Sequence, residues 1–335
     1  MPLEFTASTQ TTSFHSPLED FEPVTIEMEV REDPLTDRHT RIVPENFITP
    51  EEEPDLSPVV EDDEGCFFCP DMVTDATPTY EGPVDVDRGR RGEATSFPNL
   101  NPYGSYSNVV VLTEDHYVPI DEFTVDQLAD GLALALEYVT AAFDEDDTAR
   151  FGSINMNFLR PAGSSLIHPH MQTLADGRGT NRQAARTAAA RAYHEAEGST
   201  YWADLLDAER GGERHVGTTG DVTWLAPFAP THHRHVRGVL LDAEIPGPDD
   251  DLVRDVAEGV TNVLAAYGDL GLNSFNVAFS LVADEPASHP TVDVVARSVF
   301  DEYYWSDSPF FPILHDEGVV DVAPETYADG IGGAF

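Results

Sequence analysis

Two histidines and a glutamine alternate along one short stretch of this chain, Ser165-Leu166-Ile167-His168-Pro169-His170-Met171-Gln172. The pattern from Ser165 to Leu174 predicts a strand. Because side chains of an extended chain alternate between two faces, His168, His170 and Gln172 share one face, and Met171 points away. Two imidazoles and an amide suit a site where one histidine holds a metal ion, the other acts on substrate and the amide donates to an oxyanion. The alternative is a polar loop with two exposed histidines.

The residues that precede Ser165 favour a functional site over an exposed polar loop. Asn157 lies in a second predicted strand, Gly152–Phe158, and a turn follows it, Arg160-Pro161-Ala162-Gly163-Ser164. The backbone amides of a Gly/Ser turn can meet a phosphate. Arg160 is the preferred single phosphate contact, since it lies between Asn157 and that turn.

The only two cysteines form a second motif, Gly65-Cys66-Phe67-Phe68-Cys69-Pro70. Two thiolates at this spacing supply half of a tetrahedral zinc site. A redox pair and two incidental thiols are the alternatives. The remaining zinc ligands would have to be histidines, and the candidates are His116 and His168.

Charge excludes several classes of function. The 335 residues include 62 Asp+Glu against 18 Lys+Arg, a net charge of −44, and all 18 basic residues are Arg. Such a chain is not a generic binder of nucleic acid or anionic membranes. A carboxylate-covered surface without lysine predicts adaptation to molar salt, where the Debye length falls to about 3 Å and repulsion is screened. No signal-like or membrane-spanning segment is evident, so we expect a cytoplasmic protein.

The chain divides into four predicted segments. Residues 1–25 form a loose polar arm, 26–178 a first α+β half, 179–213 a helical connector and 214–335 a second α+β half. Val24–Arg31 and a short strand ending at Val43 form a hairpin, and the acidic, proline-rich residues 44–64 form a linker. Each half is expected to have a helix, at Thr124–Phe143 and Asp249–Tyr267. The two halves share their order of elements, which is weak evidence for duplication.

An ordered set of motifs resembles the galactose-1-phosphate uridylyltransferase family of the histidine triad superfamily. The resemblance runs from about Val24 to Gln172 and is weak beyond. Its motifs are Arg31-x-Asp33-Pro34-Leu35-Thr36, Cys66-x-x-Cys69-Pro70, Phe97-Pro98-Asn99, Asp115-His116, Asn157, Gly163-x-Ser165 and His168-Pro169-His170-x-Gln172. The resemblance implies an α+β fold of two histidine-triad-like halves, each an antiparallel sheet with packed helices.

The resemblance also implies a reaction and its site. Zinc would be held by Cys66, Cys69, His116 and His168. His170 would be the covalent nucleophile that takes a nucleotidyl group from a nucleoside diphosphate sugar and passes it to a sugar 1-phosphate, as in galactose metabolism. Gln172 and Ser165 would hold the phosphate oxygens, with Gly163 and Ser164 beside them, and Asn99 and Asn157 would hold the nucleotide or its phosphates. Members of the family are commonly homodimers.

Three positions depart from the family pattern. Met171 stands where a glycine is usual, and its bulk is expected to narrow or reshape the pocket. Glu45 replaces a basic residue, so one phosphate clamp is expected to be missing. In the second half, His289-Pro290-Thr291 resembles the H-x-H strand with its second histidine replaced, which leaves a metal site and sugar recognition there unsupported.

Two cationic clusters have no family counterpart. One is Thr231-His232-His233-Arg234-His235-Val236-Arg237, and the other consists of Arg88, Arg90 and Arg91. Each is either an anion site for substrate or a patch paired internally with carboxylates.

Three functions follow from these patterns. The first is a nucleotidyltransferase with a nucleoside diphosphate sugar and a sugar 1-phosphate as substrates. The second keeps the nucleotidyl-histidine but passes the group to phosphate or water, as a phosphorylase or hydrolase of nucleotide sugars or dinucleotides. The third, which Met171, Glu45 and Thr291 motivate, is a zinc-stabilised nucleotide-binding protein without turnover.

Overall fold

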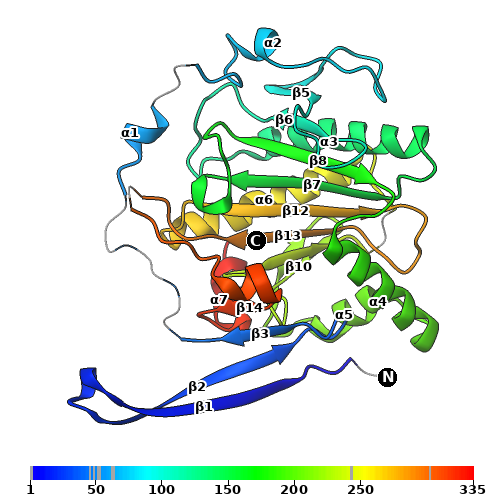
Figure 1. Ribbon diagram of the computed structural model, residues 1–335. Coiled ribbons are helices and arrows are strands. Elements are labelled where there is room, and N and C mark those ends of the chain that lie inside the picture. The colour runs from blue at the N-terminus through cyan, green and yellow to red at the C-terminus, as the bar shows by residue number, and fades with distance from the viewer. Residues whose placement is uncertain are drawn as a thin grey trace.

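A ten-stranded antiparallel sheet forms the centre of the protein (Figure 1). The computed structural model describes residues 3–44, 47, 50, 54–61, 65–241, 244–301 and 303–335. The strand order is β4-β5-β6-β8-β7-β12-β13-β11-β10-β9. Five strands come from the first half of the chain, β4 (Gly89–Arg91), β5 (Ala94–Pro98), β6 (Asn108–Val111), β7 (Phe151–Phe158) and β8 (His170–Asp176). Five come from the second, β9 (His215–Thr219), β10 (Val222–Leu225), β11 (Val236–Val239), β12 (Phe275–Val282) and β13 (Thr291–Ala296).

The two halves repeat one topology. Each runs through three strands, one long helix and two more strands, and the helices are α3 (Val125–Glu145) and α6 (Asp251–Asp269). The halves meet edge to edge, because β7 pairs with β12 from Phe158 opposite Phe275 to Phe151 opposite Val282. The predicted α+β class with two antiparallel halves is confirmed, and pairing at this seam merges the halves into one sheet.

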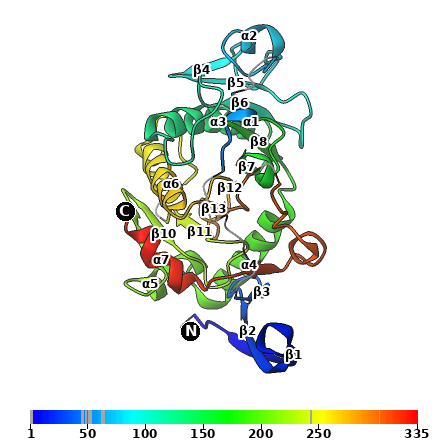
Figure 2. The same cartoon turned by 90° about the vertical axis from the view of Figure 1, so that its left-hand side faces the viewer.

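Helices α3 and α6 cover one face of the sheet, while α4 (Asn181–Glu197) lies toward the other (Figure 2). Helix α3 starts where it does because Thr124 and Gln127 form a capping box. Its apolar residues recur every three to four positions, which buries Leu128, Leu132 and Leu136 in the main core. The opposite face of the sheet is consequently left for polar side chains.

A smaller sheet has the order β1-β2-β3-β14, with strands β1 (Ala7–Ser16), β2 (Glu22–Glu32), β3 (His39–Ile42) and β14 (Gly318–Val320). The predicted hairpin is confirmed by the antiparallel pairing of β2 with β3. The expectation of a loose arm over residues 1–25 is wrong, since β1 pairs with β2 along ten residues. The sequence does not indicate this strand, because nearly all of its side chains are exposed and neither face has the apolar residues that mark a buried strand.

The connecting segments are short helices. They are η1 (Pro17–Glu19), α1 (Ser57–Val60), α2 (Val73–Ala76), η2 (Arg160–Ala162), α5 (Tyr201–Glu209), η3 (Phe311–His315) and α7 (Pro324–Gly332). Helices α4 and α5 lie within residues 179–213, where a helical connector is predicted. Glu45, with parts of the acidic linker, lies outside the described residues.

Among the helices described, none combines the length and apolar character needed to cross a membrane.

Candidate active site

Four side chains predicted to hold zinc come together at one end of the sheet. Each of Cys66, Cys69, His116 and His168 offers one ligand atom, and these atoms all lie within 4.8 Å of one another. The thiols sit in the loop before α2, His116 follows β6, and His168 precedes β8. The structure therefore assembles a group that could hold a metal ion from segments up to a hundred residues apart.

The separations in this group suit a tetrahedral ion. The Sγ to Nδ1 distances are 3.5 Å for Cys69 to His116 and 3.7 Å for each cysteine to His168. Zinc–sulfur and zinc–nitrogen bonds of about 2.3 and 2.0 Å at tetrahedral angles place such atoms about 3.6 Å apart. Donor set and spacing thus fit zinc, and Cys66 and Cys69 are not joined by a disulfide.

The ring of His168 has the tautomer that a metal ligand requires. Its Nε2–H donates to the carbonyl oxygen of Thr113 at 2.8 Å, so the lone pair is on Nδ1, which faces the thiols. Burial lowers the pKa of His168 to about 4, although the hydrogen bond to Thr113 opposes that shift. The imidazole is neutral near pH 7 and available as a ligand.

His170 begins β8 and has the complementary tautomer. Its Nδ1–H donates to the carbonyl oxygen of His168 at 2.8 Å, which leaves the lone pair on Nε2. The side chain is 7% exposed, and burial lowers the pKa of His170 below its ordinary value. The ring of Phe68 packs against it, with centroids 5.2 Å apart. A neutral, fixed imidazole with a free nitrogen is a competent nucleophile.

Polar side chains continue from His170 across the open face of the sheet. Gln172 follows on the same face of β8, and its strand partner on β7 is Asn155, whose Nδ2 donates to the carbonyl oxygen of Gln172 at 3.4 Å. Asn157 is exposed on that face, and its Oδ1 accepts from Nδ2 of Asn276 at 2.6 Å. The structure therefore brings His170, Gln172 and Asn157 together, as the alternation of side chains predicts.

The Gly/Ser turn differs from the expectation. The amide of Gly163 donates to the carbonyl oxygen of Arg160 at 2.9 Å, and that of Ser164 to the carbonyl oxygen of Leu159 at 3.2 Å. Gly163 has φ of +89°, which closes the turn. These two amides are thus used within the turn and do not point to a phosphate. The predicted strand from Ser165 also starts later, at His170. A proline at position 169 limits strand pairing there.

The remaining predicted substrate contacts lie around this face. Ser165 is exposed in the segment between the turn and β8. Arg160 is exposed, and its guanidinium lies over the ring of Phe300, with Cζ 5.7 Å from the centroid. Asn99 follows β5, and its Oδ1 accepts from the amide of Asn101. Its buried Nδ2 has no hydrogen-bond partner among the residues that the structure describes. That donor suits a bound acceptor.

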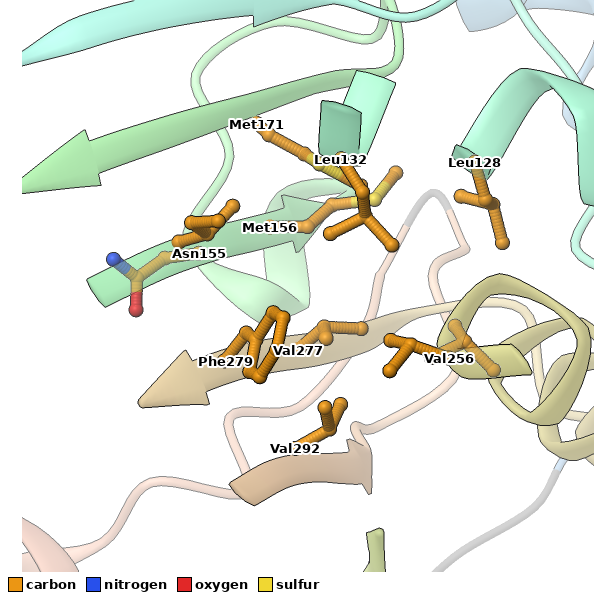
Figure 3. A pocket seen from close by; sticks show the side chains of 11 residues that line it. Leu128, Leu132, Asn155, Met156, Met171, Val256, Val277, Phe279 and Val292 are labelled. Carbon is orange, nitrogen blue, oxygen red and sulfur yellow. The ribbon is translucent and has the colours of Figure 1, made fainter. Parts of the chain in front are cut away.

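Met171 does not narrow the site. It points to the helix-covered face and joins the main core, where it lines a tight apolar space of about 10 Å³ with Leu132 and Met156 (Figure 3). Adjacent strand residues lie on opposite faces, so its bulk is separated from His170 by the sheet. The expectation of a reshaped pocket is wrong for this reason.

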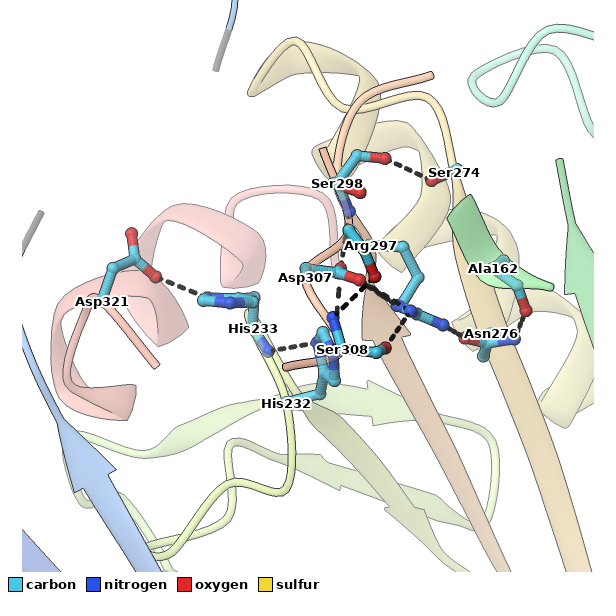
Figure 4. Close-up of polar contacts among 11 residues, drawn as sticks. Ala162, His232, His233, Ser274, Asn276, Arg297, Ser298, Asp307, Ser308 and Asp321 are labelled. Carbon is cyan, nitrogen blue, oxygen red and sulfur yellow. Dashed lines mark hydrogen bonds and ion pairs between the residues drawn. The ribbon is translucent and has the colours of Figure 1, made fainter. Parts of the chain in front are cut away.

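The histidine-rich cluster is paired internally. Asp321 accepts from Nδ1 of His233 at 2.9 Å (Figure 4). It also accepts from Arg234 at 2.6 Å. Asp293 accepts from Nε2 of His235 at 2.8 Å and from Nε of Arg237 at 2.6 Å. Internal pairing with carboxylates is therefore the correct alternative for these four residues.

The other members of both clusters are also bound within the protein. His232 is buried near Asp307, with Nε2 3.8 Å from the carboxylate, and burial lowers the pKa of His232 to about 3. Arg88 donates to Thr77 and Arg90 to Thr74, while Arg91 pairs with Asp130 and Asp249.

Three residues of the site carry no local signal in the sequence. Thr113 contributes a carbonyl oxygen to His168, and Phe68 packs beside His170. Asn276 reaches Asn157 only because β12 pairs with β7. Cross-strand register would identify Asn276, whereas the first two act through a backbone atom and a ring.

Comparison with known proteins gives one relative in sequence and several in structure. No family model matches this chain. A protein of Archaeoglobus fulgidus described as uncharacterized is 35% identical over 307 residues, which cover 91% of each chain.

The similar solved structures share the fold. An ADP-glucose phosphorylase from Arabidopsis thaliana, solved with bound ADP-glucose, has a TM-score of 0.69, 19% identity, and coverage of 91% of this chain and 98% of its own. A GalT-like protein of the same plant has a TM-score of 0.68, 19% identity and the same coverage. A uridylyltransferase has a TM-score of 0.63 and 18% identity, with 91% and 97% covered. The fold implied by the motifs is confirmed.

Proposed function

We infer the function from two premises: this chain belongs to one family with the Archaeoglobus fulgidus protein, and it has the fold of the GalT-like uridylyltransferases. We propose that it is a nucleotidyltransferase that takes a nucleoside monophosphate from a nucleoside diphosphate sugar through a covalent nucleotidyl-His170. The observation that carries the proposal is the hydrogen bond from Nδ1 of His170 to the carbonyl oxygen of His168, because it leaves Nε2 free to attack.

The proposed chemistry has two displacements. In the first, Nε2 of His170 bonds to the α-phosphorus, and the bond from that phosphorus to the oxygen bridging to the β-phosphate breaks. Sugar 1-phosphate leaves with that oxygen. In the second, a phosphate oxygen of the acceptor bonds to the same phosphorus, the nitrogen–phosphorus bond breaks and neutral His170 returns. Gln172 is positioned on the same face to donate to the phosphoryl oxygens in both steps.

Zinc is proposed as a structural ion held by Cys66, Cys69, His116 and His168. When bound, it would fix the loop of the two cysteines to the segment before β8. His168 supplies the carbonyl that orients His170, so holding His168 also holds the nucleophile. The proposed nucleophile His170 and the proposed phosphate contact Gln172 are side chains of the open face of the sheet.

The acceptor is proposed to be a sugar 1-phosphate, as in the uridylyltransferases. A phosphorylase that uses inorganic phosphate is the second candidate, and the similarity in fold to the ADP-glucose phosphorylase supports it. Both reactions require the same nucleotidyl-His170 and differ only in the group attached to the attacking phosphate.

A trapping experiment tests the intermediate. The protein is mixed in molar salt with UDP-glucose or ADP-glucose labelled with ³²P in the α-phosphate, and we expect acid-labile label on the protein. The label should be lost in His170→Asn and kept in His194→Asn, a matched change on the exposed surface of α4. Label that persists in His170→Asn, or no label from either sugar nucleotide, contradicts the proposal.

Chasing the labelled protein then identifies the acceptor. Glucose 1-phosphate or galactose 1-phosphate should release labelled nucleotide sugar, whereas inorganic phosphate should release labelled nucleoside diphosphate if the protein is a phosphorylase. Release by phosphate alone would reject the transferase in favour of the second candidate.

A further inference from the structure

Four arginine side chains meet in two adjoining cavities on the open face of the sheet. One cavity, of about 200 Å³, is lined by Arg38, Arg182, Arg186 and Arg237. The other, of about 230 Å³, shares Arg182 and Arg186 with the first and reaches Asn155 on β7. We call these four side chains with the two cavities the arginine groove. Arg182 lies in the first turn of α4, whose positive end adds to the field there.

The carboxylates of the groove do not match its cations in number. Asp293 accepts from Arg237 at 2.6 Å and from Arg186 at 3.2 Å. Asp316 pairs with Arg182 at 3.2 Å and also with Arg38. The third carboxylate is Asp33, whose Oδ1 accepts from the amides of Leu35 and Thr36 within its own turn. Four guanidinium groups thus share three carboxylates, in a chain whose net charge is −44.

The pKa values agree with this shortage of negative charge. Burial lowers the pKa of Arg186, and the neighbouring Arg237 lowers it further. Burial, with Arg182 nearby, lowers the pKa of Arg38 to about 10, and the pKa of Arg182 falls by burial as well. Arg237 is the exception, because Asp293 outweighs burial and raises its pKa. A bound anion would stabilise the three undercompensated guanidinium groups.

The groove shares a face with the candidate nucleophile. Asn155 on the wall of the second cavity is the strand partner of Gln172, two residues from His170. Asp293, which anchors Arg186, lies on β13, three strands from β8. With strands about 4.8 Å apart, Asp293 and the guanidinium groups that contact it lie roughly 14 Å or more across the sheet from β8. An anion bound there is too far away to be the phosphate that His170 attacks.

This distance indicates which part of a substrate reaches the arginines. The far end of a hexose lies on the order of 10 Å from the α-phosphorus of a nucleoside diphosphate sugar, given bond lengths of about 1.5 Å. The α-phosphorus itself stands about 3 Å from Nε2 during attack, so the far end of the sugar reaches roughly 13 Å from His170. The predicted nucleotide contact Asn99 follows β5, on the other side of β8 from the groove. The sugar is therefore the moiety that would extend toward the arginines.

We propose that the arginine groove binds an oxyanion, carboxylate or phosphate, carried by the sugar of the substrate. The proposal rests on the proposed function, since it assigns the sugar class for nucleotidyl transfer at His170. The substrate is then a nucleoside diphosphate derivative of an acidic or phosphorylated sugar, and a neutral hexose is a poor substitute.

Kinetics with matched sugars test this assignment. The kcat/KM for labelling of the full-length protein is measured in molar salt with UDP-glucose and with UDP-glucuronate, which differ by a carboxylate on the sugar. We expect UDP-glucuronate to be favoured by about tenfold or more, the size expected for a hydrogen bond to a charged group. That ratio should fall toward one in Arg186→Gln and in Arg182→Gln, and should be kept in Arg191→Gln, an exposed arginine of α4 paired with Glu285. Two variants are used because Arg186 also contacts Thr291 and is the more buried.

Binding measurements separate this inference from the proposed function. Calorimetric titration compares glucose 1-phosphate with glucuronate 1-phosphate and with glucose 1,6-bisphosphate, and the two acidic ligands distinguish a carboxylate from a phosphate. Tighter binding of either one that is lost in Arg186→Gln or Arg182→Gln supports the groove even if no label forms on His170. Equal binding of all three ligands, together with an equal kcat/KM for the two UDP-sugars, overturns the inference, while labelling of His170 keeps the proposed function.

Discussion

The carbonyl oxygen of His168 accepts a hydrogen bond from Nδ1 of His170 at 2.8 Å, and the ring of His168 faces the two thiols. One residue thus belongs to the candidate metal group through its side chain and to the candidate nucleophile through its backbone. Loss of the metal should therefore affect the chemistry, although the ion does not touch the reacting phosphate.

Removing one thiol tests this coupling. We expect about one zinc per chain, a lower zinc content in Cys66→Ser and slower labelling of His170, because the segment before β8 is no longer held. Metal analysis and the ³²P assay measure the two effects. Phe67→Leu, between the cysteines and 42% exposed, should keep the zinc. A metal-free preparation with full labelling and an unchanged melting temperature would refute the ligand assignment.

Shortening the side chain of Met171 tests whether it packs in the core or restricts the site around His170. Met171→Ala leaves a cavity among Leu132 and Met156, and we expect a loss of about 2–5 kcal/mol in the free energy of unfolding. Met171→Leu should cost less than about 1.5 kcal/mol. Urea titration in molar salt gives both values. Faster labelling of His170 in the alanine variant would mean that Met171 restricts the pocket after all.

The partly buried carboxylate of Asp321 predicts a pH dependence of stability. Burial alone would raise its pKa, but His233 and Arg234 outweigh burial and hold the pKa of Asp321 well below its usual range. Its stabilisation is therefore present above the pKa of the unfolded state, about 3.9, and is lost as pH falls through the lower folded value.

Asp321→Asn should then cost about 3 kcal/mol in the free energy of unfolding at pH 7, because it leaves the Arg234 guanidinium and the His233 ring without their anionic partner. The difference from the unsubstituted protein should shrink as pH is lowered below about 4. Asp207→Asn removes an exposed pair with Arg210 and should cost less than about 1 kcal/mol. Chemical denaturation at several pH values measures the three proteins. A difference in the free energy of unfolding that stays constant from pH 7 to pH 2 would show that the Asp321 carboxylate does not cause the pH dependence.

Dilution of salt tests the charge argument. With 62 acidic and 18 basic side chains, repulsion between carboxylates should unfold the protein when molar salt is replaced by millimolar salt, where the Debye length exceeds about 30 Å. Circular dichroism at 222 nm should lose helical signal on desalting and regain it with added KCl. An unchanged spectrum in both solutions would reject adaptation to salt.

Local patterns in the sequence predicted most of the core elements. Helix α3 follows from apolar spacing between Leu128 and Leu136, and β7 coincides with the predicted strand Gly152–Phe158 except for its first residue. Strand β1 could not be predicted, because its residues are polar on both faces and carry no sign of burial. The predicted start of β8, at Ser165, is too early, because the segment before His170 has a similar composition. The boundaries proposed at residues 178 and 213 remain a prediction, which limited proteolysis of the connector can test.

The ligand types, the alternation that places His170 and Gln172 on one face, and the excess of negative charge can all be read from the order and kind of the amino acids. These are properties of spacing and composition, so they need no knowledge of distant contacts. Folding in three dimensions sets the pairing of the histidine-rich cluster with Asp293 and Asp321, the place of Met171 in the core, and the meeting of Arg38 with the arginines of the groove. The partners in these contacts come from strands and helices far apart in the chain, and strand register and helix packing set which side chains meet.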